Sequence, residues 1–66
     1  MKVLVIISTD DSETMFNAMR LANIGVEKKD EVSVFMLGKG VKFEQVDSTS
    51  FDVMGQINQF EGDFYV

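Results

Sequence analysis

The sequence contains no cysteine, histidine, proline or tryptophan, and the first two absences exclude whole classes of chemistry. Without cysteine the chain cannot form a disulfide, and without cysteine and histidine it lacks the usual ligands of a structural zinc site. The same absences remove the thiol and imidazole groups from which most nucleophilic sites are built. We therefore predict no catalytic residue, no metal ligand and no cofactor in this chain.

Positive charge is also scarce, because 6 Lys and Arg residues face 11 Asp and Glu residues, for a formal net charge of −5. This balance argues against nucleic acids and anionic membrane surfaces as partners. The longest apolar run, Val3 to Ile7, is too short to cross a bilayer, and no secretory signal follows Lys2. We expect a cytoplasmic protein.

The length of 66 residues allows one domain at most. Such a domain buries only about 60% of the surface of its unfolded chain. Small folds usually add disulfides, a metal or a partner chain, and the first is impossible here. We expect residues 1–66 to form a single α/β domain that is truncated or is completed by association.

Two short apolar runs, Val3–Ile7 and Val32–Leu37, are apolar at nearly every position. Continuous apolarity is typical of strands buried on both faces in a parallel sheet. The interval between them fits a right-handed βαβ unit. We therefore predict two interior, parallel neighbours whose following loops open on a common rim of the sheet.

The segment between the two runs has the periodicity of an amphipathic helix. Asp11 or Ser12 is a suitable N-cap, and Gly25 is suited to end the helix. The expected apolar stripe comprises Met15, Ala18, Met19, Ala22 and Val26, widened by Phe16 and Leu21. Methionines at such positions are expected to fill the core.

The second half of the chain is less regular. Residues 41–50 fit either a short edge strand or an irregular loop, with 47–50 as loop and capping material. A second helix is expected near 51–60, with an apolar stripe interrupted by Gly55, and a third strand at 63–66. The predicted fold class is α/β, a Rossmann-like three-layer α/β/α arrangement with a parallel sheet, incomplete here as β-α-β-α-β.

Ligands of open α/β sheets bind at the carboxyl ends of the strands, where two polar segments follow the two apolar runs. The pocket-lining candidates are Ser8, Thr9, Asp10 and Asp11 after the first run, and Gly38, Lys39 and Gly40 after the second. Lys39 and Lys42 could hold an anion. The simpler interpretation is a capped helix start and a turn whose lysines lie in water.

The paired acids Asp10 and Asp11 resemble the Mg²⁺ pocket of response-regulator receiver domains, since hard oxygen ligands suit that ion. In receivers the acids directly follow the strand, whereas here Ser8 and Thr9 intervene. The hydroxyl-rich loop also resembles the phosphate loop of flavodoxins, but its acids would repel a phosphate. A solvated acidic loop is the alternative to both.

Three stretches together resemble the amino-terminal part of the DsrE/DsrF/YchN-like family of small sulfur-relay proteins. They are KVLVIISTDDSETMFNAMRLAN, DEVSVFMLGKGV and FDVMGQINQFEGDFYV. The resemblance implies a Rossmann-like domain that assembles into trimers or hexamers, or with related subunits. It also implies a persulfide carried on a cysteine in or beyond the loop after the third strand, a residue that this sequence does not contain.

The resemblance therefore implies a sulfurtransferase-like relay function whose thiol lies outside these residues, with a sulfur-carrier protein as a partner. Thr9, Asp10 and Gly38–Gly40 would line the pocket that faces this thiol. Two alternatives remain open: a cysteine-less structural subunit that scaffolds an active partner, and a receiver-like signalling domain with an acidic, Mg²⁺-binding loop.

Overall fold

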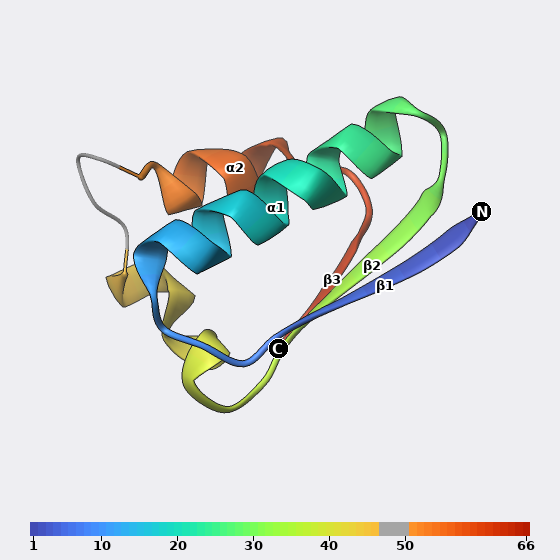
Figure 1. Ribbon diagram of the computed structural model, residues 1–66. Coiled ribbons are helices and arrows are strands. Elements are labelled where there is room, and N and C mark those ends of the chain that lie inside the picture. Colours follow the sequence, from blue (N-terminus) through green and yellow to red (C-terminus); the bar gives the residue numbers. More distant parts are fainter. Residues whose placement is uncertain (47–50) are drawn as a thin grey trace.

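The computed structural model describes residues 1–46 and 51–66, and its elements alternate between strand and helix (Figure 1). The predicted α/β class, incomplete as β-α-β-α-β, is confirmed. The elements are β1 (Lys2–Ile7), α1 (Ser12–Glu27), β2 (Glu31–Met36), the 3₁₀ helix η1 (Gly38–Gln45), α2 (Val53–Gln59) and β3 (Asp63–Tyr65). The expected loop and cap at 47–50 lies outside the described residues.

The three strands form one parallel sheet in the order β1-β2-β3. β1 and β2 pair from Lys2 opposite Glu31 to Ile7 opposite Met36, so the predicted parallel neighbours are confirmed. The prediction that both strands are interior is wrong for β1. β3 pairs with the far side of β2, and within residues 1–46 and 51–66 no strand pairs with the outer edge of β1.

Both α-helices lie on the same face of the sheet, as Figure 1 shows, so the described chain supplies two of the three predicted layers. The prediction that the first strand is buried on both faces is therefore wrong. Leu4 and Ile6, which point away from the helices, are each 58% exposed. An apolar run indicates that a strand can be covered on both faces, but it does not supply the covering element.

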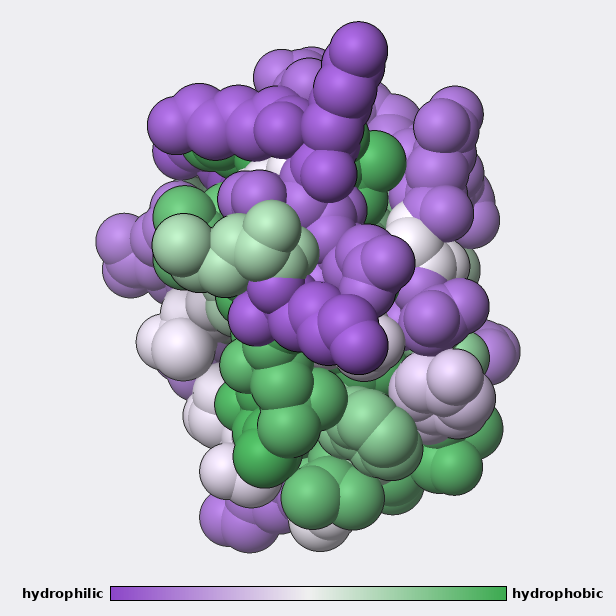
Figure 2. Space-filling model, turned by 90° about the vertical axis from the view of Figure 1, so that its right-hand side faces the viewer, coloured by the Kyte–Doolittle hydropathy of each residue, from purple (hydrophilic) through white to green (hydrophobic). Residues whose placement is uncertain are grey.

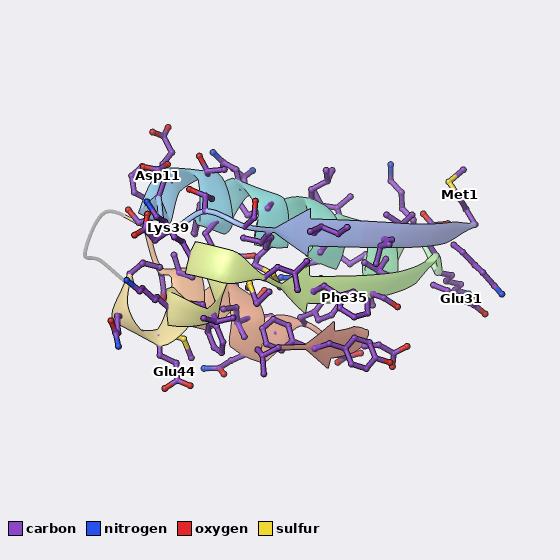
Figure 3. The ribbon with its side chains drawn as sticks, turned by 90° about the horizontal axis from the view of Figure 1, so that it is seen from below. Met1, Asp11, Glu31, Phe35, Lys39 and Glu44 are labelled. Atoms are coloured by element: carbon purple, nitrogen blue, oxygen red, sulfur yellow. The ribbon has the colours of Figure 1, made fainter. Side chains whose placement is uncertain are left out.

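The uncovered side of the sheet forms an apolar surface. In Figure 2, where the helices lie uppermost, apolar side chains gather on the lower part of the molecule and polar ones above. Figure 3 views the molecule from below, with the strands in front of the helices. Phe35 of β2 stacks on Tyr65 of β3 on this side, with 4.7 Å between ring centroids.

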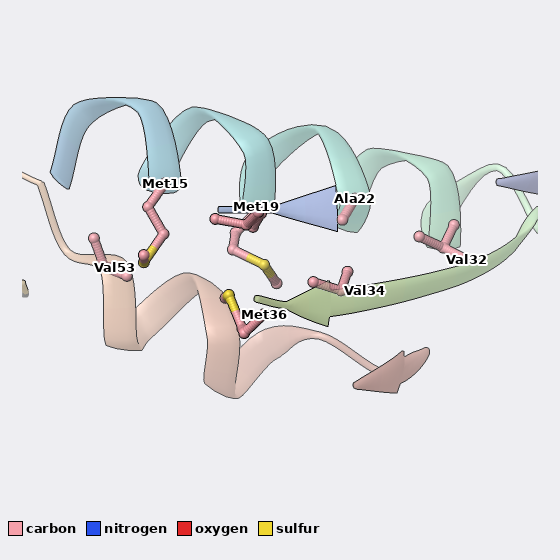
Figure 4. Packing of buried hydrophobic residues seen from close by; sticks show 8 residues of the cluster. Met15, Met19, Ala22, Val32, Val34, Met36 and Val53 are labelled. Carbon is pink, nitrogen blue, oxygen red and sulfur yellow. The ribbon is translucent and has the colours of Figure 1, made fainter. Parts of the chain in front are cut away.

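The core lies between the sheet and the two α-helices and is built from methionine, valine, isoleucine and alanine side chains (Figure 4). Met15 and Met19 of α1 meet Met36 of β2, and all three are fully buried. The prediction that methionines fill the core is confirmed for these residues. The unbranched, flexible methionine side chain suits the irregular space between helix and sheet.

Helix α1 begins as predicted at its N-cap, Asp11, but it does not end at Gly25. A Cβ on Gly25 would lie 2.9 Å from Val32 Cγ2, so this glycine lets the helix pack closely on β2. Lys29 takes the left-handed conformation after the helix, with φ of 67°. Leu21, expected on the buried stripe, is 67% exposed and lies on the outer side of α1.

Residues 38–45 form the 3₁₀ helix η1, and this corrects the expectation of an edge strand or irregular loop after the glycines. Alternation in the sequence suggested a strand, but the backbone forms 3₁₀ turns instead, with a kink at Lys42. Phe43 lies edge-on against Phe64 of β3, with 5.4 Å between ring centroids. This contact holds η1 beside the end of the sheet.

Candidate functional site

The two polar segments predicted to form a site meet at the carboxyl rim of the sheet. The Leu37 N–H donates a hydrogen bond of 2.9 Å to the carbonyl of Ile7, so the chain leaves β2 against the end of β1. Gly40 is buried against the same Ile7 carbonyl, and a Cβ on Gly40 would overlap that oxygen. Gly38 has a positive φ of 53°, and a Cβ there would lie 4.0 Å from the Ser8 carbonyl oxygen. The structure thus brings Ser8, Gly38 and Gly40 together.

The carboxylate of Asp11 is engaged in capping α1. Its Oδ2 accepts hydrogen bonds from the Thr14 backbone N–H at 2.9 Å and from the Thr14 hydroxyl at 2.7 Å. These bonds favour the charged form and lower the pKa of Asp11 below its ordinary value. The Thr9 hydroxyl in turn accepts a bond of 3.1 Å from the Asp11 N–H. Thr9 and Asp11 therefore stabilise the loop and the helix start.

Ser8, Asp10 and Lys39 remain exposed at this rim. Figure 3 shows Lys39 and Asp11 at the same end of the molecule, opposite the end that carries Met1 and Glu31. No salt bridge in the described part of the chain includes Lys39. The rim therefore offers the ammonium group of Lys39 beside a backbone with glycine at positions 38 and 40.

The described residues do not provide a metal centre. Within residues 1–46 and 51–66, no group of three or more Asp or Glu side chains is placed to hold a metal ion. Asp11, which the receiver-like alternative would use as a ligand, instead bonds to Thr14. No helix in this part of the chain is both long enough and apolar enough to cross a membrane.

A hollow of about 770 Å³ lies elsewhere, at the amino ends of the strands. Its lining includes Leu4, Phe35 and Tyr65 from the open side of the sheet and the acidic residues Glu61 and Asp63 beside β3. None of the predicted rim residues lines it. Sequence reasoning missed this hollow, because the apolar runs predicted strands that are covered on both faces. The acids on either side of Gly62 were the only feature of the sequence that pointed to a surface there.

Comparisons with known proteins identify no relative of this chain. No family model matches the chain, and no curated protein or solved structure matches it significantly.

Proposed function

We propose that this chain is a DsrE-like sulfur-relay protein whose carboxyl rim receives a persulfide-bearing cysteine from polypeptide outside these 66 residues. The sequence resemblance supports the relay chemistry. One geometric observation supports the location: the loop at Ser8 and the turn Gly38–Gly40 lie in contact at the end of β1 and β2. Because the chain contains no cysteine, the sulfur-bearing thiol belongs to other polypeptide.

The chain contributes position and charge to this chemistry. In the transfer, an acceptor thiolate attacks the terminal sulfur of the persulfide, a new S–S bond forms, the old one breaks, and the carrier cysteine leaves as a thiolate. The exposed ammonium of Lys39 attracts the persulfide anion to the rim, and the Ser8 hydroxyl is an available donor. The buried Gly40 keeps the Lys39 backbone close to β1.

The proposal includes an assembly in the cytoplasm, as a trimer or hexamer of this chain or with related subunits, and a sulfur-carrier protein as the partner. Three features of the described residues support association: the small core, the outer edge of β1, which is unpaired there, and the side of the sheet that neither α1 nor α2 covers. Each leaves apolar or hydrogen-bonding groups in water.

Glutathione persulfide is a suitable probe of the rim, with glutathione as the thiol control. We expect the persulfide to shift the backbone amide NMR signals of residues 38–40 more than the thiol does. Lys39→Gln should weaken binding about fivefold, as expected for loss of one exposed charge interaction. Lys29→Gln, which removes a lysine from the turn after α1, should leave binding unchanged. Equal weakening by both variants, or no binding, would overturn the rim assignment.

The absence of cysteine also favours a second candidate, a structural subunit that scaffolds an active partner. An assembly purified through this chain should gain about 32 Da of sulfur on a cysteine of an associated polypeptide after treatment with a persulfide donor. If that adduct forms equally with Lys39→Gln, and the rim does not bind the probe, the scaffold role is supported over the relay role. If no adduct forms, both roles fail.

A further inference from the structure

The open face of the sheet, defined here as Leu4, Ile6, Phe35 and Tyr65, is an unusual surface for a parallel sheet. Leu4 and Ile6 are each 58% exposed, and Tyr65 is 47% exposed. Phe35 of the central strand β2 stacks on Tyr65 of β3, and Figure 3 shows Phe35 on the strand side that neither described α-helix covers. The face is therefore apolar, preformed and accessible.

The architecture of parallel sheets indicates which kind of element fits this face. All-parallel sheets occur almost only with helices on both faces, because βαβ crossovers place helices there. Within residues 1–46 and 51–66, α1 and α2 lie on one face of the sheet. A helix with one apolar side therefore matches the open face better than a second sheet does.

The charges beside the open face indicate which charge a docked helix would carry. The hollow over the amino ends of the strands is lined by the acids Asp30, Glu31, Glu61 and Asp63 and by one lysine, Lys2. Asp30 pairs with the amino terminus at 3.3 Å, and Glu31 lies 3.9 Å from Lys2. In the described part of the chain, no salt bridge includes Glu61 or Asp63. The acidic excess therefore lies at the β3 side of the hollow.

We propose that the open face docks an amphipathic helix of a partner protein, with its apolar stripe on the open face and its basic side chains against Glu61 and Asp63. The fit combines two independent features. The apolar open face matches the apolar side of a helix, and the carboxylates of Glu61 and Asp63 favour Lys or Arg at one end of that helix. Docking would complete the third layer of the fold.

Tyr65 is the only tyrosine of the chain and lies on the open face, so its fluorescence reports docking directly. The probe is a peptide of roughly 15 residues, enough for a helix, with a Leu stripe, Lys in its last turns and no aromatic residue. We expect it to protect Tyr65 from acrylamide quenching, to compete with self-association of the chain through the open face, and to leave a 1:1 complex in sedimentation. A matched peptide with Glu in place of Lys should bind about tenfold more weakly.

Variants of exposed residues separate docking from loss of folding. Ile6→Thr on the open face and the double variant Glu61→Gln, Asp63→Asn should each weaken binding of the Lys peptide about tenfold. Leu21→Thr, on the outer side of α1, should leave it unchanged. Equal affinity for both peptides, or equal binding by Ile6→Thr and Leu21→Thr, would overturn the proposal. So would a discrete dimer through the open face that the peptide does not dissociate, since a second copy would then be the occupant.

Discussion

Gly40 illustrates a residue whose role depends on a distant part of the chain. It is buried against the carbonyl of Ile7, which lies 33 positions earlier in the sequence. Ile7 ends β1, the strand that pairs in parallel with β2. Gly38 and Gly40 indicate a turn at residues 38–40, but the sequence does not reveal which part of the backbone these glycines approach. The N-cap Asp11 was predictable because its partner, Thr14, lies within the same helical turn.

Substitution of Gly40 by alanine should strongly destabilise the chain. The added Cβ overlaps the Ile7 carbonyl oxygen, so η1 must move away from the end of β1. We expect a loss of about 1–3 kcal/mol in the free energy of unfolding, as for overpacked sites, measured by urea titration. Gly38→Asn is the control, because asparagine tolerates the positive φ of 53° at that position. Equal stabilities of Gly40→Ala and the parent chain would refute this account of η1.

Asp11 should make stability depend on acidic pH. Its folded-state pKa is lowered by the bonds from Thr14, so its stabilising contribution is present above the ordinary aspartate pKa. That contribution is lost as the pH falls through the lowered pKa, because the protonated carboxyl no longer favours those bonds. Asp11→Asn keeps a capping oxygen without titrating, so its melting temperature should fall less on acidification than that of the parent chain. Parallel melting curves across the acidic range would contradict this assignment.

At the scale of elements, periodicity predicted the type and order of each strand and α-helix, but not which of their faces are covered. Met15 and Met19 follow the helical spacing and are buried, whereas Leu21, placed on the widened stripe, points outward. The position of α2 explains the difference, since it packs beside α1 on the same side of the sheet. A sequence pattern records apolarity, while coverage depends on how distant elements pack.

The contact between α1 and α2 includes one polar bridge that should contribute measurably to stability. Asn23 of α1 donates from Nδ2 to the Gln56 backbone carbonyl at 2.9 Å and to Gln56 Oε1 at 3.0 Å, in a partly buried position. Asn23→Ala should lower the free energy of unfolding by about 1–2 kcal/mol, because it leaves these acceptors without a donor. Asn17→Ala, at an exposed position of the same helix, should change it by less than about 0.5 kcal/mol. Equal effects of the two substitutions would show that the bridge adds no stability.

At the scale of the whole molecule, the candidate site and the hollow lined by Leu4, Phe35 and Tyr65 lie at opposite ends of the sheet. Sequence reasoning predicted that the two polar segments share one rim, because the carboxyl ends of parallel strands lie at one edge, and Ser8 does lie near Gly38 there. It could not place the hollow, whose walls come from both ends of the chain, Leu4 and Glu61 among them. These walls meet only after β3 has paired with β2.

The small core and the open face together predict that the chain does not remain a monomer in solution. A chain of 7.4 kDa buries too little surface for more than marginal stability on its own, and its exposed Leu4 and Ile6 favour self-association. We expect sedimentation velocity to show species heavier than 7.4 kDa at micromolar concentration. Leu4→Thr combined with Ile6→Thr places β-branched residues suited to a strand at both positions and should shift the distribution to lighter species. Leu21→Thr, on the helical side, should have little effect. A well-folded monomer of the parent chain would contradict this prediction, because it would mean that the uncovered face costs the fold little in water.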